Sequence, residues 1–77
     1  MKEYLYTVIL EPDPTEGGYT VTVPALEGCV TQGETLEEAI AMAKDAIQLY
    51  IETLQAEGTP VPEEQEHPQA LTISIAA

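Results

Sequence analysis

The sequence predicts an α+β domain in which one helix covers one face of a small β-sheet. Three observations lead to this fold class: segments that alternate apolar and polar residues, turns rich in proline and glycine, and one long stretch with apolar residues at helical spacing. The chain has 77 residues, the size of one small domain. We therefore expect residues 1–77 to form a single domain with the element order β-β-β-α-β.

A first strand is predicted over residues 4–11, which read YLYTVILE and are rich in aromatic and β-branched side chains. Both faces of this strand are partly apolar, so we expect a helix to cover one face and a partner subunit to cover the other. The expected helix-facing side chains are Tyr4, Tyr6, Val8 and Leu10, and those of the other face are Leu5, Thr7, Ile9 and Glu11.

Two more strands should follow as an antiparallel meander. Residues 12–18 read PDPTEGG and form a turn, after which residues 19–23 alternate valine and threonine as a half-buried strand. Pro24 ends that strand because proline cannot donate to a central ladder. The chain turns again at residues 25–28, and a short third strand is predicted over residues 29–33.

The helix is predicted to run from about Leu36 to Glu57. Thr35 and Glu38 have the spacing of a capping box, in which each side chain satisfies a backbone amide at the start of the helix. Gly58 stands where a helix ends and Pro60 prevents continuation. The apolar face of this helix consists of Leu36, Ile40, Ala43, Ile47, Tyr50 and Leu54.

A fourth strand is predicted at residues 70–76, where Leu71, Ile73 and Ile75 alternate with polar residues after a proline-rich acidic connection. A right-handed crossover through the helix would place this strand parallel to the first one. The expected result is a four-stranded mixed sheet of order 3-2-1-4, with the helix on one face and the opposite face open to another chain.

The charge of the chain is strongly negative. Fourteen acidic residues stand against two lysines and no arginine, which gives a net charge of −12. Direct nucleic acid binding needs cations that replace counterions along the phosphate backbone, so this function class is excluded. An acidic surface suits a basic protein partner, although the same charge also serves solubility alone.

Self-association is expected because a domain of this size has only a small core. One cysteine cannot form an internal disulfide, and one histidine with one cysteine cannot complete an ordinary zinc site. We therefore expect a homodimer or a larger homo-oligomer without a cofactor. With neither a membrane-spanning apolar run nor a signal peptide in the sequence, we expect a cytoplasmic protein.

No catalytic set is evident in the sequence. Cys29 lies among acidic residues, which raise the pKa of a thiol, and is interpreted as a small core residue. His67 is interpreted as a solvated loop residue. The carboxylates of Glu11, Asp13 and Glu16 could hold a hard cation, but their spacing is not that of a calcium loop. A metal-dependent hydrolase built on these carboxylates stays a third, less favoured hypothesis.

Residues 4–64 resemble the HicB-like antitoxins of HicA–HicB toxin–antitoxin systems. The resemblance depends on several elements in order, since none is specific alone. They are an E-x-D-x-x-x-G-G-Y hairpin at Glu11–Tyr19, a P-x-L-x-G-C-x-T-x-G-x-T segment at Pro24–Thr35, an L-E-E-A helix start at Leu36–Ala39, and the exit G-T-P-V-P at Gly58–Pro62.

This resemblance implies a partial RNase H-like fold without nuclease activity, and a basic HicA-like mRNA interferase toxin as the partner. Many members of the family continue into a DNA-binding domain, which we do not expect within residues 1–77. The leading hypothesis is an antitoxin that blocks its toxin by stoichiometric binding, and the alternative is a stand-alone oligomeric regulatory or scaffolding domain without a toxin. From acidity and loop position, the expected contact residues are Glu11, Asp13, Glu16, Tyr19 and Glu27.

Overall fold

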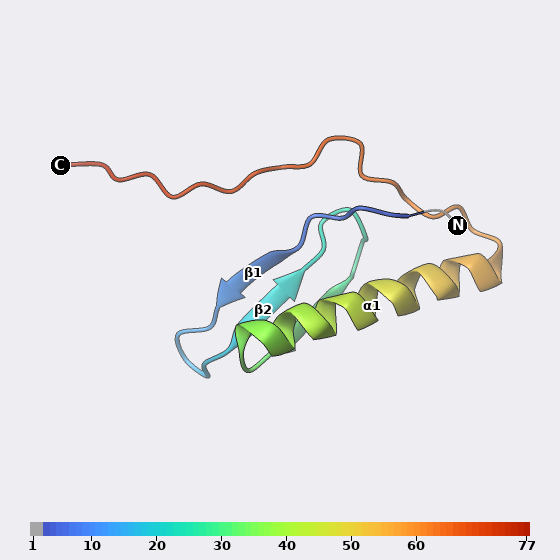
Figure 1. Cartoon of the computed structure of the whole chain (residues 1–77), viewed down its shortest axis with the longest axis horizontal. Coiled ribbons are helices and arrows are strands. Elements are labelled where there is room, and N and C mark those ends of the chain that lie inside the picture. Colours follow the sequence, from blue (N-terminus) through green and yellow to red (C-terminus); the bar gives the residue numbers. More distant parts are fainter. Residues whose placement is uncertain (1–2) are drawn as a thin grey trace.

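The fold is α+β, as predicted, with one helix packed on a three-stranded sheet (Figure 1). The structure is a computed structural model that describes residues 3–77. Residues 1 and 2, included in the expected domain, lie outside the described residues. The elements are β1 (Ile9–Pro12), β2 (Tyr19–Thr22), β3 (Val30–Gly33) and α1 (Leu36–Glu57).

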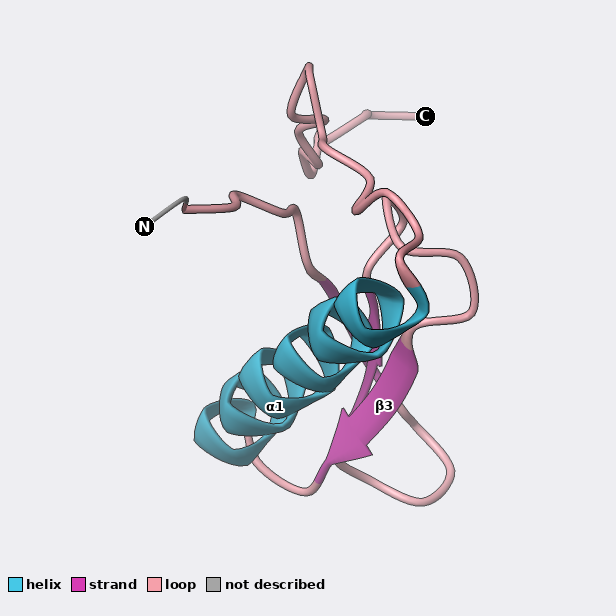
Figure 2. Cartoon of the chain, turned by 90° about the vertical axis from the view of Figure 1, so that its right-hand side faces the viewer, coloured by secondary structure: helices cyan, strands magenta, loops and turns pink. Residues whose placement is uncertain are grey.

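The three strands form an antiparallel meander in the order β1-β2-β3. Thr22 of β2 lies between Ile9 of β1 and Val30 of β3, while Val21 pairs with Leu10 on one side and Thr31 on the other. Val21 is fully buried under the helix, whereas Ile9 and Val30 are 38% and 60% exposed. One face of the sheet is therefore covered by α1 and the opposite face is bare, as the alternation in the sequence predicts (Figure 2).

The helix bounds, the glycine cap and one half of the predicted capping box are found in the structure. The hydroxyl of Thr35 accepts a hydrogen bond of 3.1 Å from the amide of Glu38. At the other end, Gly58 adopts a left-handed conformation with φ of 71°, and its amide donates to the carbonyl of Gln55. Glycine adopts this conformation without the steric cost of a Cβ atom, which explains why α1 ends there.

The core is small and divides into two clusters of buried side chains. Val21 packs with Ala39 and Ala43 of the helix in the first cluster. Val23, Leu26 and Cys29 form the second, at the end of the sheet where the chain turns into β3. The small alanine side chains allow α1 to approach the sheet closely, but a core of this size gives limited hydrophobic stabilisation.

The first strand is shorter than predicted. Residues 4–8 are not assigned to a strand, and the pairing of β1 with β2 ends at Ile9 and Thr22. Pro24 interrupts the ladder, and the amide of Leu26 bonds to the carbonyl of Val23 at 3.0 Å within the turn. β1 accordingly starts only at Ile9.

The predicted fourth strand is absent from the described residues, and with it the predicted sheet order 3-2-1-4. Residues 70–76 are all exposed and are not assigned to a strand in the structure. The chain leaves α1, passes beside residues 6 and 7, and then runs away from the body of the domain (Figure 1). Apolar alternation is a property of the segment alone, whereas a strand also needs a neighbouring edge within reach.

Candidate functional site

The loop between β1 and β2 is ordered around the carboxylate of Asp13. One oxygen, Oδ1, accepts hydrogen bonds from the amides of Thr15 at 2.9 Å and Glu16 at 3.2 Å. These amides, that of Thr15 first, hold the pKa of Asp13 below its usual range because they stabilise the ionised form. Gly17 and Gly18 have φ values of 80° and 75°, which complete the tight turn. A negative charge is thus fixed at the tip of this loop.

The start of α1 lies next to this loop. A Cβ atom on Gly18 would lie 2.5 Å from the carbonyl oxygen of Gly33, so the loop backbone lies directly against the end of β3. Glu34 follows β3 immediately, and Glu38 stands in the first turn of α1. The contact between the two glycines therefore brings acidic residues from two distant stretches of the chain to the same end of the sheet.

Together these segments form an open cleft of about 370 Å³. Its lining is polar and, among residues 3–77, includes no lysine, arginine or histidine, and we call it the acidic cleft. The lining residues are Asp13, Glu16, Gly17, Tyr19, Thr20, Gln32, Gly33, Glu34, Glu38 and Met42. Four carboxylates around one concave surface produce a negative field that attracts cationic groups.

Three of the five expected contact residues, Asp13, Glu16 and Tyr19, line this cleft. Glu11 lies on β1 opposite Thr20, on the bare face of the sheet. Glu27 lies in the turn at the other end of the sheet, where its backbone carbonyl accepts a hydrogen bond of 2.8 Å from the hydroxyl of Tyr50. The structure therefore separates Glu27 from the other four.

Reasoning from the sequence missed Glu34 and Glu38 as members of the cleft. The sequence pattern assigns Glu38 to helix capping, and the structure shows its amide donating to the hydroxyl of Thr35. The strand register is the feature that could have placed both residues in the acidic cleft. Pairing of β2 with β3 sets Tyr19 opposite Gly33, so the residues after Gly33 must meet the hairpin loop.

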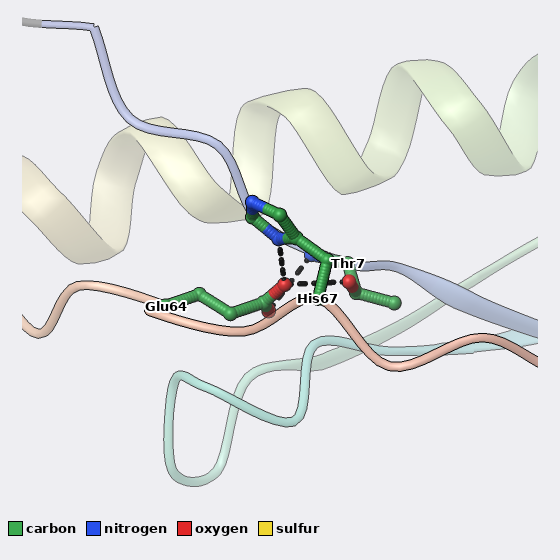
Figure 3. Close-up of polar contacts among 3 residues, drawn as sticks. All are labelled: Thr7, Glu64 and His67. Atoms are coloured by element: carbon green, nitrogen blue, oxygen red, sulfur yellow. Dashed lines mark hydrogen bonds and ion pairs between the residues drawn. The ribbon is translucent and has the colours of Figure 1, made fainter.

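A second polar cluster, also missed, joins the acidic connection after α1 to the segment before β1 (Figure 3). The carboxylate of Glu64 accepts hydrogen bonds from the amide of Thr7 at 2.9 Å and from its hydroxyl at 2.6 Å. His67 contacts the same carboxylate, and the hydroxyl of Tyr6 donates to the carbonyl of Pro62 at 2.5 Å. The side chain of Glu64 is only 7% exposed, so this cluster fastens residues 62–67 to the domain.

Cys29 and His67, two of the residues considered for catalysis, do not line the acidic cleft. Cys29 is 6% exposed in the core, and burial raises the pKa of its thiol. Within residues 3–77, no three His, Cys, Asp or Glu side chains converge in a way that could hold a metal ion. None of the helices in this part of the chain combines the length and apolarity needed to cross a membrane. The arrangement of the acidic cleft favours binding of cationic groups.

Comparisons with known proteins found one matching family model and several relatives. Residues 6–72 match the family model described as HicB-like antitoxin of bacterial toxin–antitoxin system. The UPF0150 protein ssr1765 of Synechocystis sp. is 49% identical over 72 residues, covering 94% of this chain and 90% of that protein. The UPF0150 protein Ta0767 of Thermoplasma acidophilum is 49% identical over 57 residues, covering 74% of this chain and 81% of that protein.

One relative has a functional name. Antitoxin HicB 1 of Photorhabdus laumondii is 49% identical over 47 residues, which cover 61% of this chain. The match spans only 30% of that longer protein. The similarity to this relative therefore concerns one part of it.

Proposed function

The chain belongs to the HicB-like antitoxins of bacterial toxin–antitoxin systems, and from this premise we propose that it neutralises a basic, HicA-like mRNA interferase by stoichiometric binding. In this proposal the antitoxin makes and breaks no covalent bond. It acts in the cytoplasm as a homodimer or homotetramer, and it covers the cationic surface with which the toxin holds RNA.

The observation that carries this proposal is the acidic cleft. Asp13, Glu16, Glu34 and Glu38 line one concave surface in a chain of net charge −12. A toxin that binds RNA needs a surface rich in lysine and arginine, because these residues replace the counterions of the phosphate backbone. Carboxylates form short, charge-assisted hydrogen bonds with guanidinium groups, often in pairs.

Complementary charge also explains how an antitoxin could find its toxin quickly. Opposite fields steer two proteins toward each other and raise the association rate, most strongly at low salt. The acidic cleft provides the local part of that field, and the bare sheet face with Glu11 extends it. Glu27, at the other end of the sheet, belongs to the proposed contact surface only if the toxin spans the whole domain.

The test is a binding measurement between the purified chain and the basic toxin encoded by a neighbouring reading frame, supported by relief of growth arrest on co-expression. The cleft variant carries Asp13→Asn, Glu16→Gln, Glu34→Gln and Glu38→Gln. Asparagine keeps an acceptor oxygen for the two amides that Asp13 binds, so the loop should keep its shape. We expect binding to weaken by at least about tenfold, mainly through a slower association rate.

The matched control changes four exposed acidic residues elsewhere, namely Asp45→Asn, Glu52→Gln, Glu57→Gln and Glu66→Gln. Both variants raise the net charge from −12 to −8, so they differ only in where charge is removed. The control should bind within about threefold of the original chain. Equal weakening of both variants would show that net charge matters and the cleft does not. The single change Glu27→Gln tests the far end of the sheet in the same way.

The alternative function, a stand-alone oligomeric regulatory or scaffolding domain, draws support from the exposed apolar residues of the C-terminal segment. Leu71, Ile73 and Ile75 are each more than 70% exposed, and such surface usually marks an interaction site. A stable oligomer combined with no basic toxin gene beside its own would favour this alternative. The binding experiment separates the two, because the alternative predicts no charge-dependent partner.

A further inference from the structure

We propose that the C-terminal segment, residues 70–76, is a strand that each chain donates to a second copy of itself. It would lie along the β1 edge of the second copy and place its apolar side chains in a groove beside α1. Reciprocal exchange then gives a closed dimer in which each sheet has four strands. This inference is independent of the toxin and concerns how the domain completes its core.

The groove lies between the segment that leads into β1 and the exposed flank of α1. Its volume is about 690 Å³, and most of its lining is apolar. Tyr6, Val8 and Leu10 line one wall, and Ile40, Ile47 and Ile51 line the other. Ile40 is 42% exposed although it lies on the predicted apolar face of the helix. The hydrophobic stripe of α1 is therefore only partly covered by the chain's own sheet.

The wall formed by β1 is also an edge of the sheet. Ile9–Pro12 pairs with β2 on one side, and the described residues contain no strand on its other side. An edge strand offers a row of backbone donors and acceptors that an additional strand can pair with. An incoming strand at this edge would bond to the backbone and cover the groove with one set of its side chains.

The C-terminal segment has the properties of that strand. Leu71, Ile73 and Ile75 are 79%, 71% and 79% exposed, and their spacing of two places all three on the same side of an extended chain. Residues 68–77 contain no Asp, Glu, Lys, Arg or His. This lack of charge matters because two copies with a net charge of −12 repel each other through most of their surface.

The position of Glu64 explains why the segment does not reach its own β1. Its hydrogen bonds fix residue 64 beside Thr7. Pro12, the last residue of β1, is five residues beyond Thr7, whereas Leu71 is seven residues beyond Glu64. A tail that followed β1 from Glu64 in extended form, at about 3.3 Å per residue, would pass the end of β1 before Leu71. In the structure the tail instead bends at residues 65–66. Figure 1 shows the tail running past the sheet and away from it.

The surface buried by such an exchange extends into the size range of specific protein interfaces. Burying one leucine or isoleucine removes roughly 60–120 Å² of apolar surface from water. Six side chains and the groove walls that they cover then account for roughly 700–1,400 Å². A specific protein interface needs at least about 1,000 Å² in total. A single segment docked on one side would fall short of this area, which favours the reciprocal arrangement.

Two measurements on the full chain test the proposal. The first is the dimer dissociation constant from sedimentation equilibrium, for the original chain and for Ile73→Asp and Thr72→Asp. Ile73→Asp places a charge toward the groove and should weaken the dimer at least about 100-fold. Thr72→Asp adds the same charge to the opposite side of the strand and should weaken it less than about threefold. Equal effects of the two changes would overturn the proposal.

The second measurement needs no mutation and so does not depend on how the variants fold. Isotope-labelled and unlabelled chains are mixed, and nuclear Overhauser effects are recorded between the two kinds of chain. We expect contacts between the methyl groups of Ile73 in one chain and those of Leu10 or Ile47 in the other. A monomer, or a dimer in which these contacts arise only within one chain, would refute strand exchange. Either result leaves the toxin-binding test unaffected.

Discussion

Gly33 and the backbone of Ala39 are in such close contact that no side chain fits between them. A Cβ atom on Gly33 would lie 2.5 Å from the amide nitrogen of Ala39 and 2.6 Å from its Cα. Ala39 is fully buried. This contact presses the first turns of α1 onto the end of β3 and so fixes the position of Glu34 and Glu38 beside the hairpin loop.

We therefore expect Gly33→Ala to lower the free energy of unfolding by about 1–3 kcal/mol or more, the usual range for overpacking a core site. The backbone of a capped helix cannot yield as a flexible side chain can. Chemical denaturation followed by the helical circular dichroism signal measures the change. The control is Gln32→Ala, at the exposed neighbouring position of β3, which should lower the unfolding free energy much less. An unchanged stability for Gly33→Ala would mean that the helix does not sit this close to the strand.

The hydrogen bond between Tyr50 and Glu27 ties the helix to the turn before β3. The hydroxyl of Tyr50 donates to the carbonyl of Glu27 at 2.8 Å, across 23 positions in the sequence. Tyr50→Phe removes this bond and keeps the ring in the core, so we expect a loss of about 0.5–1.5 kcal/mol in unfolding free energy. Tyr19→Phe removes a hydroxyl at the other end of the sheet and should lower the unfolding free energy less. If both changes lower the unfolding free energy equally, the hydrogen bond between Tyr50 and Glu27 makes no specific contribution to stability.

The contact between Glu64 and Thr7 should depend on pH. The hydroxyl of Thr7, then its amide, and to a lesser degree His67 lower the pKa of Glu64, while burial opposes them. Because the pKa is lower in the folded chain than in the unfolded chain, this carboxylate stabilises the fold above the ordinary pKa of a glutamate. The contribution disappears as the pH falls through the lowered pKa of the folded chain.

Titration of the Glu64 carboxyl by nuclear magnetic resonance measures this effect. Thr7→Val removes the largest cause, the hydroxyl donor, and should move the pKa of Glu64 up toward its ordinary value. Thr20→Val changes a threonine on β2 away from this cluster, so it should leave the pKa of Glu64 unchanged. An identical Glu64 titration in the two variants would rule out the Thr7 hydroxyl as the cause.

Cys29 should react slowly with thiol reagents in the folded chain. Its side chain is 6% exposed, and burial raises the pKa of the thiol, so little of the reactive thiolate is present. We expect reaction with an aromatic disulfide reagent to be at least about 100-fold slower in the folded chain than in denaturant. The control is Cys29→Ala with Val30→Cys, which moves the thiol to a position that is 60% exposed. Rapid modification of native Cys29 would contradict its place in the core.

Some features of this fold depend only on residues that lie close together in the sequence. Thr35, Glu38 and Gly58 define both ends of α1 correctly because capping depends on residues a few positions apart. The threonine and valine alternation of β2 correctly indicated which face the helix covers. The segment at residues 70–76 has the same kind of alternation, yet it is not a strand in the structure, because a strand also needs a neighbouring strand to pair with.

The α+β class, the helix and its ends, the hairpin loop and the negative charge can be predicted from the sequence, because each depends on short-range pattern or on composition. Tertiary packing brings Glu34 and Glu38 to one cleft with Asp13 and Glu16, and it joins Glu64 to Thr7 across 57 positions. It also decided that β1 begins at Ile9 and that the tail runs free of its own sheet. These features result from strand register and the close approach of backbones, which arise only when distant parts of the chain pack against each other.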